Sequence, residues 1–300
     1  MKIAYFGLPL GALLLNQDGH ELGTIVLSPV DAPGRRRLEQ QAPHLIDARS
    51  GSEGARSDLE PRIDAALSAE PVELLVSWFW TRKLPARWLA RAKLGGVGVH
   101  PSLLPRHRGP NPYFWAIDAG DERTGVTLHR LTEEYDDGKL LASRDLLIGD
   151  RDAWQLARAL DRPSLALLRE AVARLARGEP LAEADQDEAL ATWAPEPSGA
   201  ELRVDFGWTT ERVLRRIRAL SPTPGVALEV AGVRLFVTRA ARTESFIKAL
   251  LPGEAHVSDG LVLRTSDGAV VVSRAFFPDL DADATTASDV VSLMKRAAEP

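Results

Sequence analysis

Residues 98–112 of the chain read GVHPSLLPRHRGPNP. The short apolar run Gly96–His100 predicts a strand, and the prolines and arginines after it predict a loop, so His100 stands where the strand ends. In an open sheet of parallel strands, ligands bind beyond the carboxyl ends of the strands. The stretch therefore places a titratable side chain at the edge where such a sheet would bind a ligand.

On both sides of this stretch, apolar runs of strand length alternate with helical patterns. The expected strands are 2–6, 22–27, 72–76, 96–100, 124–131 and 140–148. The expected helices are 85–93, 112–119 and 153–177, the last with a break or kink at Pro163. Residues 29–37 predict a loop with three arginines, and residues 43–60 a poorly defined segment. This alternation predicts a Rossmann-like α/β fold, a mainly parallel sheet with helices on both faces.

The amino-acid composition changes after about residue 180. Proline, acidic and small residues predict a linker, and the helical pattern 210–220 ends at SPTPG (221–225). Four strand-like runs follow at 226–230, 233–238, 260–265 and 269–274. We therefore expect an α/β domain over 1–182, a linker over 183–204, and a small β-rich domain, an OB-like barrel, over 205–300.

Composition excludes several classes of function. The 300 residues include no cysteine, which removes disulfides and thiolate metal sites, and no cluster has metal-ligand spacing, so we expect no metal. The GLPLG at 7–11 lacks the dinucleotide fingerprint. No apolar run has the length of a membrane span. We therefore expect a cytoplasmic monomer with no membrane partner. The net charge of −5 argues against a dominant polyanion-binding role.

His100 and Asp136 are the clearest candidates for catalytic residues. Asp136 lies in EEYDDG (133–138), in the loop that leaves another expected strand, so both side chains can face one crevice. A carboxylate favours the charged imidazole and fixes its orientation, which makes the two a competent pair for proton transfer. By pattern alone, a structural histidine and an ordinary Asp–Gly turn are the more common outcomes.

The order of several segments resembles the folate-dependent formyltransferases. The central segments are HPSLLPRHRG (100–109), NPYFWAIDAGDERTGVT (111–127) and YDDGKLL (135–141). KIAYFGLP (2–9) and ELLVSWFWTRKLP (73–85) are similar to the family's opening strand and its pterin-lining loop. ATWAPEP (191–197) and ERVLRRIRALSPTPG (211–225) are similar to the methionyl-tRNA formyltransferase branch.

The resemblance implies transfer of a formyl group from the co-substrate 10-formyltetrahydrofolate to an amine, with initiator tRNA carrying methionine as the expected acceptor. His100 would donate to the developing oxyanion, and Asp136 would keep His100 charged and accept the amine proton. The residues implied for the co-substrate are Trp80, Leu84, Ser102, Leu103, Leu104, Pro105, Tyr135 and Gly138. Those implied for the acceptor are Arg35, Arg36, Arg37, Arg108 and Asn111.

Gly98 departs from the family pattern, which has asparagine two residues before the histidine. Residues i and i+2 of a strand face the same side, so glycine removes an amide donor from the site. Loss of one oxyanion donor costs about 10²–10³ in turnover. Three alternatives stay open: another donor fills the gap, the acceptor differs, or the protein binds folate without transfer.

The identity of the acceptor also stays open. Arg212, Arg215 and Arg216 fall on one face of the expected helix 210–220, where they could meet phosphates or simply face solvent. Acidic and basic residues are about equal in number after residue 204, whereas tRNA-binding domains usually carry a positive excess. A small amine, such as an amino sugar or a metabolite, is therefore the second acceptor class.

Overall fold

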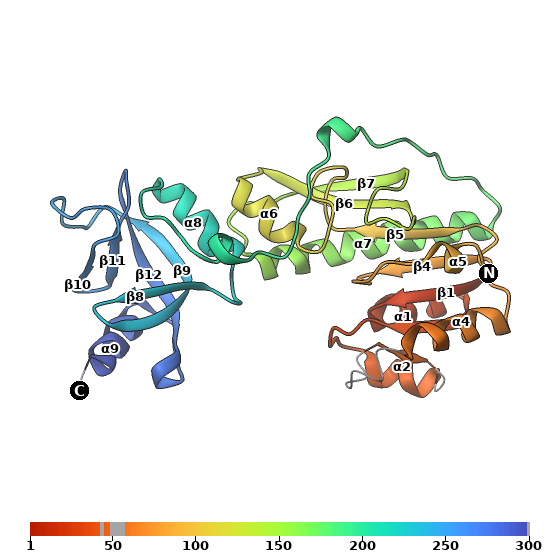
Figure 1. Ribbon diagram of the computed structural model, residues 1–300, viewed down its shortest axis with the longest axis horizontal. Helices are drawn as coiled ribbons and strands as arrows, with labels where there is room; N and C mark the ends of the chain where they lie inside the picture. Colours follow the sequence, from red (N-terminus) through yellow and green to blue (C-terminus); the bar gives the residue numbers. More distant parts are fainter. Residues whose placement is uncertain (43–44, 49–57, 299–300) are drawn as a thin grey trace. The chain divides into compact units, whose positions relative to one another are not determined.

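The computed structural model describes residues 1–42, 45–48 and 58–298 and divides into two compact units (Figure 1). Unit 1 comprises Met1–Pro110, Thr124–Leu146 and Ala159–Trp193, and unit 2 comprises Asn111–Arg123, Leu147–Arg158 and Ala194–Pro300. The domain limits expected from the sequence stay a prediction. Across the described residues, no helix combines the length and the apolar character needed to cross a membrane.

Unit 1 is built on a seven-stranded sheet of order β3-β2-β1-β4-β5-β6-β7. Its strands are β1 (Lys2–Gly7), β2 (Glu21–Leu27), β3 (Ile46–Asp47), β4 (Leu74–Trp78), β5 (Gly96–His100), β6 (Arg123–Arg130) and β7 (Leu140–Leu147). The pairs from β3 through β5 are all parallel, and β6 pairs antiparallel with β5. The mainly parallel, Rossmann-like sheet expected from the sequence is confirmed.

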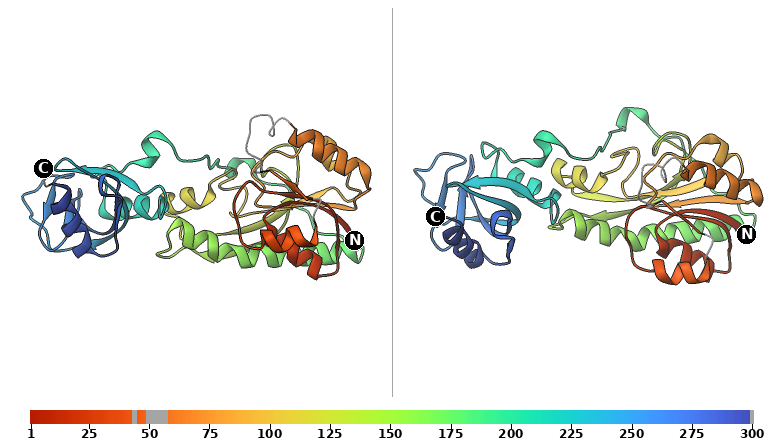
Figure 2. Two further views of the ribbon diagram at one scale, coloured as in Figure 1. Left: turned by 90° about the horizontal axis from the view of Figure 1, so that it is seen from below. Right: turned by 60° about the horizontal axis from the view of Figure 1, so that its bottom comes forward.

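Helices cover both faces of this sheet, with α1 (Pro9–Gln17) and α7 (Ala153–Ala176) on one face and α4 (Leu59–Ala69) and α5 (Ala86–Leu89) on the other (Figure 2). Alternate residues of a strand point to opposite faces. Phe6 accordingly joins the core cluster with residues of α4 and α5. On the opposite face, the indole Nε1 of Trp78 donates to Ser164 of α7 at 2.9 Å. Pro163 lies inside α7, which is continuous, so of the expected break or kink the break is absent and the kink stays a prediction.

The loop expected at residues 29–37 was partly wrong. Arg35–Arg37 form the first turn of α2 (Arg35–Gln41) rather than a loop. Gly34, with φ of 92°, takes the N-cap position, and Arg35 is buried, with its guanidinium 2.7 Å from Asp47 and donating to the carbonyl of Ser28. In the weakly patterned stretch 43–60, residues 43–44 and 49–57 lie outside the described residues, and α4 begins at Leu59.

Unit 2 contains an antiparallel sheet of order β10-β11-β12-β9-β8, with β13 paired to β12. Its strands are β8 (Val226–Val230), β9 (Val233–Thr243), β10 (Ala255–Val257), β11 (Leu261–Arg264), β12 (Ala269–Phe277) and β13 (Ala282–Ala284). The small β-rich domain is confirmed, and residues 265–268 form the turn that joins β11 to β12. The strands β10 and β13 and the last helix, α9 (Ala287–Ala297), were not expected from the sequence.

A buried ion pair joins α6 (Pro112–Ala119) to α8 (Thr210–Ala219) within unit 2. Arg216 is 5% exposed and binds the carboxylate of Asp118 through two hydrogen bonds, at 2.6 and 3.0 Å. Arg212 also donates to Asp118, at 3.2 Å. Arg216 therefore faces neither phosphates nor solvent, because Asp118 binds its guanidinium group. Arg212 is also engaged by Asp118, but its side chain is still 33% exposed.

Candidate active site

His100 lies at the end of β5, near the middle of the sheet, and is 6% exposed. Its Nδ1 is 3.3 Å from Oδ2 of Asp136, and its Nε2 is 2.7 Å from the carbonyl oxygen of His107. The structure thus brings together the histidine and the carboxylate, although 36 positions separate them in the sequence. A carbonyl oxygen can only accept, so Nε2 of His100 carries a proton.

The loop that carries Asp136 is held in place on several sides. The backbone N–H of Gly109 donates to Oδ2 of Asp136 at 2.9 Å. The side-chain amide of Gln186 donates to the carbonyl oxygens of Asp136 and Gly138, at 2.8 and 2.7 Å. A Cβ at Gly138 would lie 1.9 Å from the carbonyl oxygen of Arg130, so only glycine fits this close approach.

His129 is a second histidine at the same carboxylate. Its Nδ1 is 2.9 Å from the carbonyl oxygen of Arg130, and its Nε2 is 3.6 Å from Oδ1 of Asp136. Burial lowers the pKa of His129 because the apolar surroundings disfavour the charged ring, although the nearby Asp136 opposes this shift. In the sequence, His129 alternates with apolar residues along its strand, a pattern typical of a structural histidine, whereas the structure places it beside the pair.

Gly98 lies between Ser77 of β4 and His129 of β6 in the pairing of the sheet. A Cβ at Gly98 would lie 2.7 Å from Cδ2 of Leu131 and 3.6 Å from Nε2 of His129. The space that a side chain at position 98 would need is therefore already taken by Leu131. Any side chain there would also reach toward the second histidine.

Three of the loops near these strand ends contain a non-glycine residue with positive φ. The residues are Phe79, His107 and Asp136, with φ of 58°, 61° and 57°. Such conformations cost roughly 1–3 kcal/mol each and cluster at active sites and ligand clamps. The strain therefore coincides with the edge of the sheet where His100 and Asp136 meet.

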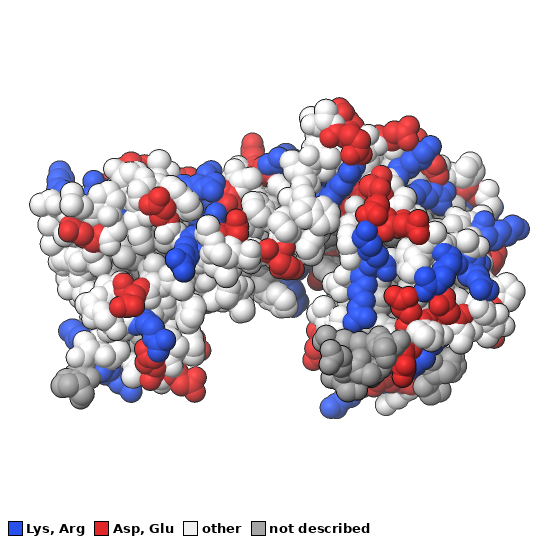
Figure 3. Space-filling view, viewed as in Figure 1, with Lys and Arg blue, Asp and Glu red and all other residues white. Residues whose placement is uncertain are grey.

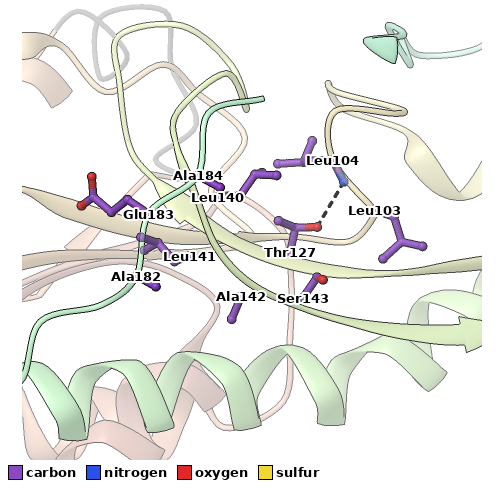
Figure 4. Close-up of a pocket in the computed structure, with 10 residues that line it drawn as sticks. All are labelled: Leu103, Leu104, Thr127, Leu140, Leu141, Ala142, Ser143, Ala182, Glu183 and Ala184. Carbon is purple, nitrogen blue, oxygen red and sulfur yellow. Dashed lines mark hydrogen bonds between the residues drawn. The ribbon is translucent and has the colours of Figure 1, made fainter. Parts of the chain in front are cut away.

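Leu103 and Leu104 line a pocket of about 260 Å³ in unit 1 (Figure 4). Thr127, which is paired with His100 between β5 and β6, also lines it, and its Oγ1 accepts from the backbone N–H of Leu104 at 3.1 Å. The hydroxyl of Ser102 is buried and donates to the carbonyl of Arg106 at 2.6 Å, which makes it a loop-forming contact. Pro105 completes this loop.

The other residues expected at the co-substrate have different surroundings. The indole ring of Trp80 packs edge-on against Phe6 at 5.4 Å, and its buried Nε1 has no hydrogen-bond partner among the described residues. Leu84 belongs to the hydrophobic core and is 5% exposed. Tyr135 is half-buried and lies 6.2 Å from the ring of Trp193. Trp80 therefore presents a donor that a ligand could satisfy.

The residues expected at the acceptor are only partly free. Arg108 donates to Gln186 and Glu188, at 2.7 and 2.6 Å. Asn111 caps α6, where its Oδ1 accepts from the N–H of Phe114 at 3.1 Å. Arg36 and Arg37 are exposed, in contrast to the buried Arg35, and they line a surface hollow with residues 31–35 and Glu39.

Gln186 and Leu131 were not expected at the site from the sequence, and His129 was expected to be structural. Only the two-residue spacing of Thr127 and His129 along β6, continued by Leu131 directly after the strand, indicated that these side chains share a face. The described residues contain no group of three or more His, Asp or Glu side chains that could hold a metal ion.

Comparisons with known proteins agree with this architecture. Residues 6–171 match the family model described as Formyl transferase, and residues 198–283 match that of the Formyl transferase C-terminal domain. A protein named methionyl-tRNA formyltransferase from Thermus thermophilus is 33% identical over 285 residues, which cover 92% of this chain and 88% of that protein.

Two solved structures share the fold. HypX from Aquifex aeolicus, solved with tetrahydrofolic acid, has a TM-score of 0.64 and 23% identity over 93% of this chain, which spans 44% of the length of HypX. The sugar 3N-formyl transferase WlaRD, solved in the presence of dTDP and 5-N-formyl-THF, has a TM-score of 0.66 and 12% identity. The match covers 91% of this chain and 96% of that one.

Proposed function

Because the chain belongs to the formyl transferase family, we propose that it transfers a formyl group from 10-formyltetrahydrofolate to the amino group of methionyl-initiator tRNA. The observation that carries this proposal is the contact between His100 and Asp136 at the carboxyl ends of the strands, 3.3 Å apart. Family membership gives the reaction class, and this pair supplies the groups that the reaction needs.

Formyl transfer puts negative charge on the formyl oxygen when the amine attacks. Donors aimed at that oxygen lower the barrier. The Nε2–H of His100, which donates to the carbonyl of His107 in this structure, is the proton that this residue can offer. Asp136, with Oδ2 3.3 Å from Nδ1 of His100, fixes the orientation of the ring. The buried donor of Trp80, which has no hydrogen-bond partner among the described residues, is a further group that the co-substrate could satisfy.

Two observations support tRNA as the acceptor. Relatives over most of the chain carry the name methionyl-tRNA formyltransferase. Arg36 and Arg37 are exposed at the start of α2, where they can meet phosphates.

A small amine is the second candidate acceptor. It is favoured by the engagement of Arg212 and Arg216 with Asp118, which removes two cations from a phosphate-binding role. Acidic and basic side chains are also interspersed on the face of the molecule that Figure 3 shows. The likeness to a sugar 3N-formyl transferase shows that this fold serves such acceptors elsewhere.

The test incubates the purified protein with 10-formyltetrahydrofolate and methionyl-initiator tRNA, with the His100→Ala variant as control. We expect the wild-type protein to formylate the tRNA at a rate well above that of the control. A panel of amino sugars and small amines, analysed by mass spectrometry, runs in parallel. Transfer to a member of this panel and none to tRNA would replace the acceptor, and no transfer to any amine would refute the proposed reaction.

A further inference from the structure

Residues 182–193, which we call the strap, form a segment of unit 1 that is anchored near both of its ends. Near its start, Ala184 exchanges two backbone hydrogen bonds with Leu140 of β7, at 2.8 and 2.9 Å (Figure 4). Near its end, the hydroxyl of Thr192 accepts from the backbone N–H of His107 at 2.8 Å. The part of the strap between these anchors is therefore held in a defined position.

Gln186 lies between the two anchors and is half-buried, whereas both of its neighbours in the chain are exposed. Its amide nitrogen donates to the carbonyl oxygens of Asp136 and Gly138, at 2.8 and 2.7 Å. Its amide oxygen accepts two hydrogen bonds from the guanidinium of Arg108, at 3.0 and 2.7 Å. A primary amide has two N–H donors and two acceptor positions, so the hydrogen-bonding capacity of this side chain is fully used.

These partners allow only one orientation of the amide. A carbonyl oxygen only accepts, and a guanidinium only donates. Turning the amide over would place its oxygen against two carbonyl oxygens and its N–H groups against Arg108, and no hydrogen bond could form on either side. The donor side of Gln186 therefore faces the loop of Asp136, and a side chain without these donors cannot take its place.

The backbone of Asp136 has a conformation that needs such support. Its φ is 57°, and strained conformations of this kind persist where the surrounding structure holds them. Gln186 binds the carbonyl oxygen of this same residue and that of Gly138, two positions later. The amide thus fixes the main chain at the residue whose Oδ2 lies 3.3 Å from Nδ1 of His100.

The strap also holds the second partner of His100. His107 has a φ of 61°, and its N–H is the group that donates to the hydroxyl of Thr192. The carbonyl oxygen of His107 is 2.7 Å from Nε2 of His100. Both ring nitrogens of His100 therefore face residues with positive φ, and each of these residues is bound by a side chain of the strap.

We propose that Gln186 is a positioning residue for formyl transfer, which holds the backbone of Asp136 so that its carboxylate stays beside His100. This proposal rests on the proposed function and adds to it a residue outside the two loops that meet at the site. Gln186 acts through Asp136 and takes up no proton itself. A misplacement of reacting groups by about 1 Å can cost about 10² in rate, so the loss of this support should be measurable.

The first test compares Gln186→Glu and Gln186→Met in single-turnover transfer, with the enzyme in excess and both substrates saturating. Glutamate keeps the size of the side chain and its contact with Arg108, but it places an oxygen against two carbonyl oxygens. Methionine keeps the length and loses both contacts. We expect the rate constant of each variant to fall by about 10². A variant that only folds less well would have fewer active molecules but the same saturated rate constant.

The matched control is Glu188→Gln. Glu188 also binds Arg108 from the strap, at 2.6 Å, but it is exposed. Exposed ion pairs contribute little, so this variant should stay close to the wild-type rate.

The second test combines Gln186→Met with Asp136→Asn. If Gln186 acts through the carboxylate of Asp136, its replacement should cost little further rate once that carboxylate is gone. Two losses that multiply as independent effects would overturn the proposal.

The third test requires no activity and uses ¹⁵N NMR of the histidine rings in the full chain without ligands. We expect the signals of His100, identified by their loss in His100→Ala, to move in Gln186→Met and to stay in place in Glu188→Gln. With an active wild-type protein, an unchanged rate of Gln186→Met or unmoved His100 signals would refute the role of Gln186 only. A wild-type protein inactive on every acceptor would refute the proposed function, and the His100 signals would then decide whether Gln186 holds the pair.

Discussion

Replacing Gly98 with asparagine is expected to damage this site rather than repair it. The family pattern has asparagine at this position, so restoring it could be expected to raise the rate. In the structure, however, a Cβ at Gly98 would lie 2.7 Å from Cδ2 of Leu131, closer than side-chain carbons normally approach. Leu131 also lies 3.0 Å from the corresponding position at Gly96, so the leucine fills the space beside both glycines.

The size of the effect follows from this crowding. Inserting atoms into a packed region costs about 1–3 kcal/mol, and we expect the free energy of unfolding of Gly98→Asn to fall by that amount. We also expect the transfer rate to fall by about tenfold, which corresponds to about 1.4 kcal/mol, because the amide extends into the space beside Nε2 of His129. Removing the leucine should relieve the crowding, so the double variant with Leu131→Ala should be more stable than the sum of the two single changes predicts.

Urea denaturation of the wild type, both single variants and the double variant measures this coupling, and single-turnover transfer measures the rate. Gly96→Ala is the control, since it is crowded by the same leucine but lies two residues farther along the strand from His100. We expect a favourable coupling of at least about 1 kcal/mol between Gly98→Asn and Leu131→Ala. Additivity within about 0.5 kcal/mol, or a higher rate for Gly98→Asn alone, would show that the reasoning is wrong.

Three further predictions concern other parts of the molecule. Asp118→Asn should lower the free energy of unfolding by about 3–5 kcal/mol, because it leaves the buried guanidinium of Arg216 without its carboxylate. Urea denaturation measures this loss, and a loss below about 1 kcal/mol would contradict the prediction. Changing both Arg36 and Arg37 to alanine should raise KM for tRNA and weaken the dependence of KM on salt, while kcat changes little. An unchanged salt dependence of KM would exclude these arginines from phosphate binding. The lowered pKa of His129 should make the protein less stable as the pH falls below the ordinary histidine value of 6.5, because only the unfolded chain then takes up that proton, and this loss should be weaker in His129→Phe.

The sheet of unit 1 could be predicted because each buried strand corresponds to a short apolar run in the sequence. Gly96–His100 was expected at its observed limits, and so was the helix Pro112–Ala119. A strand buried on both faces needs apolar residues at nearly every position, and that requirement is local. The meeting of His100 with Asp136 followed from the same local pattern, once the carboxyl ends of the strands were assumed to share an edge.

The errors arose where pairing between distant residues decides the structure. Arg35 starts a helix although three consecutive arginines suggested a loop, and its contact with Asp47 lies twelve positions away. Arg216 is buried because Asp118 meets it from 98 positions away. The local sequence does not predict such a contact. A charged side chain is therefore expected to face solvent unless its distant partner is known.

His129 was set aside for the same reason. In the sequence it alternates with apolar residues, as a structural histidine would. Its importance comes from Gly98 across the strand pair and from Asp136 in the following loop, and neither relation can be seen from one strand alone. The substitution at Gly98 was recognised in the sequence, but its neighbours Leu131 and His129 were identified only in the structure.

The most direct test of the central claim is the single-turnover rate of formyl transfer for the wild-type protein and the Asp136→Asn variant, with tetrahydrofolate affinity measured for both. Asparagine keeps the size of the side chain and removes the charge that both histidines face. The account predicts a rate lower by about 10²–10⁴ with little change in affinity. Equal rates in the two proteins would contradict it.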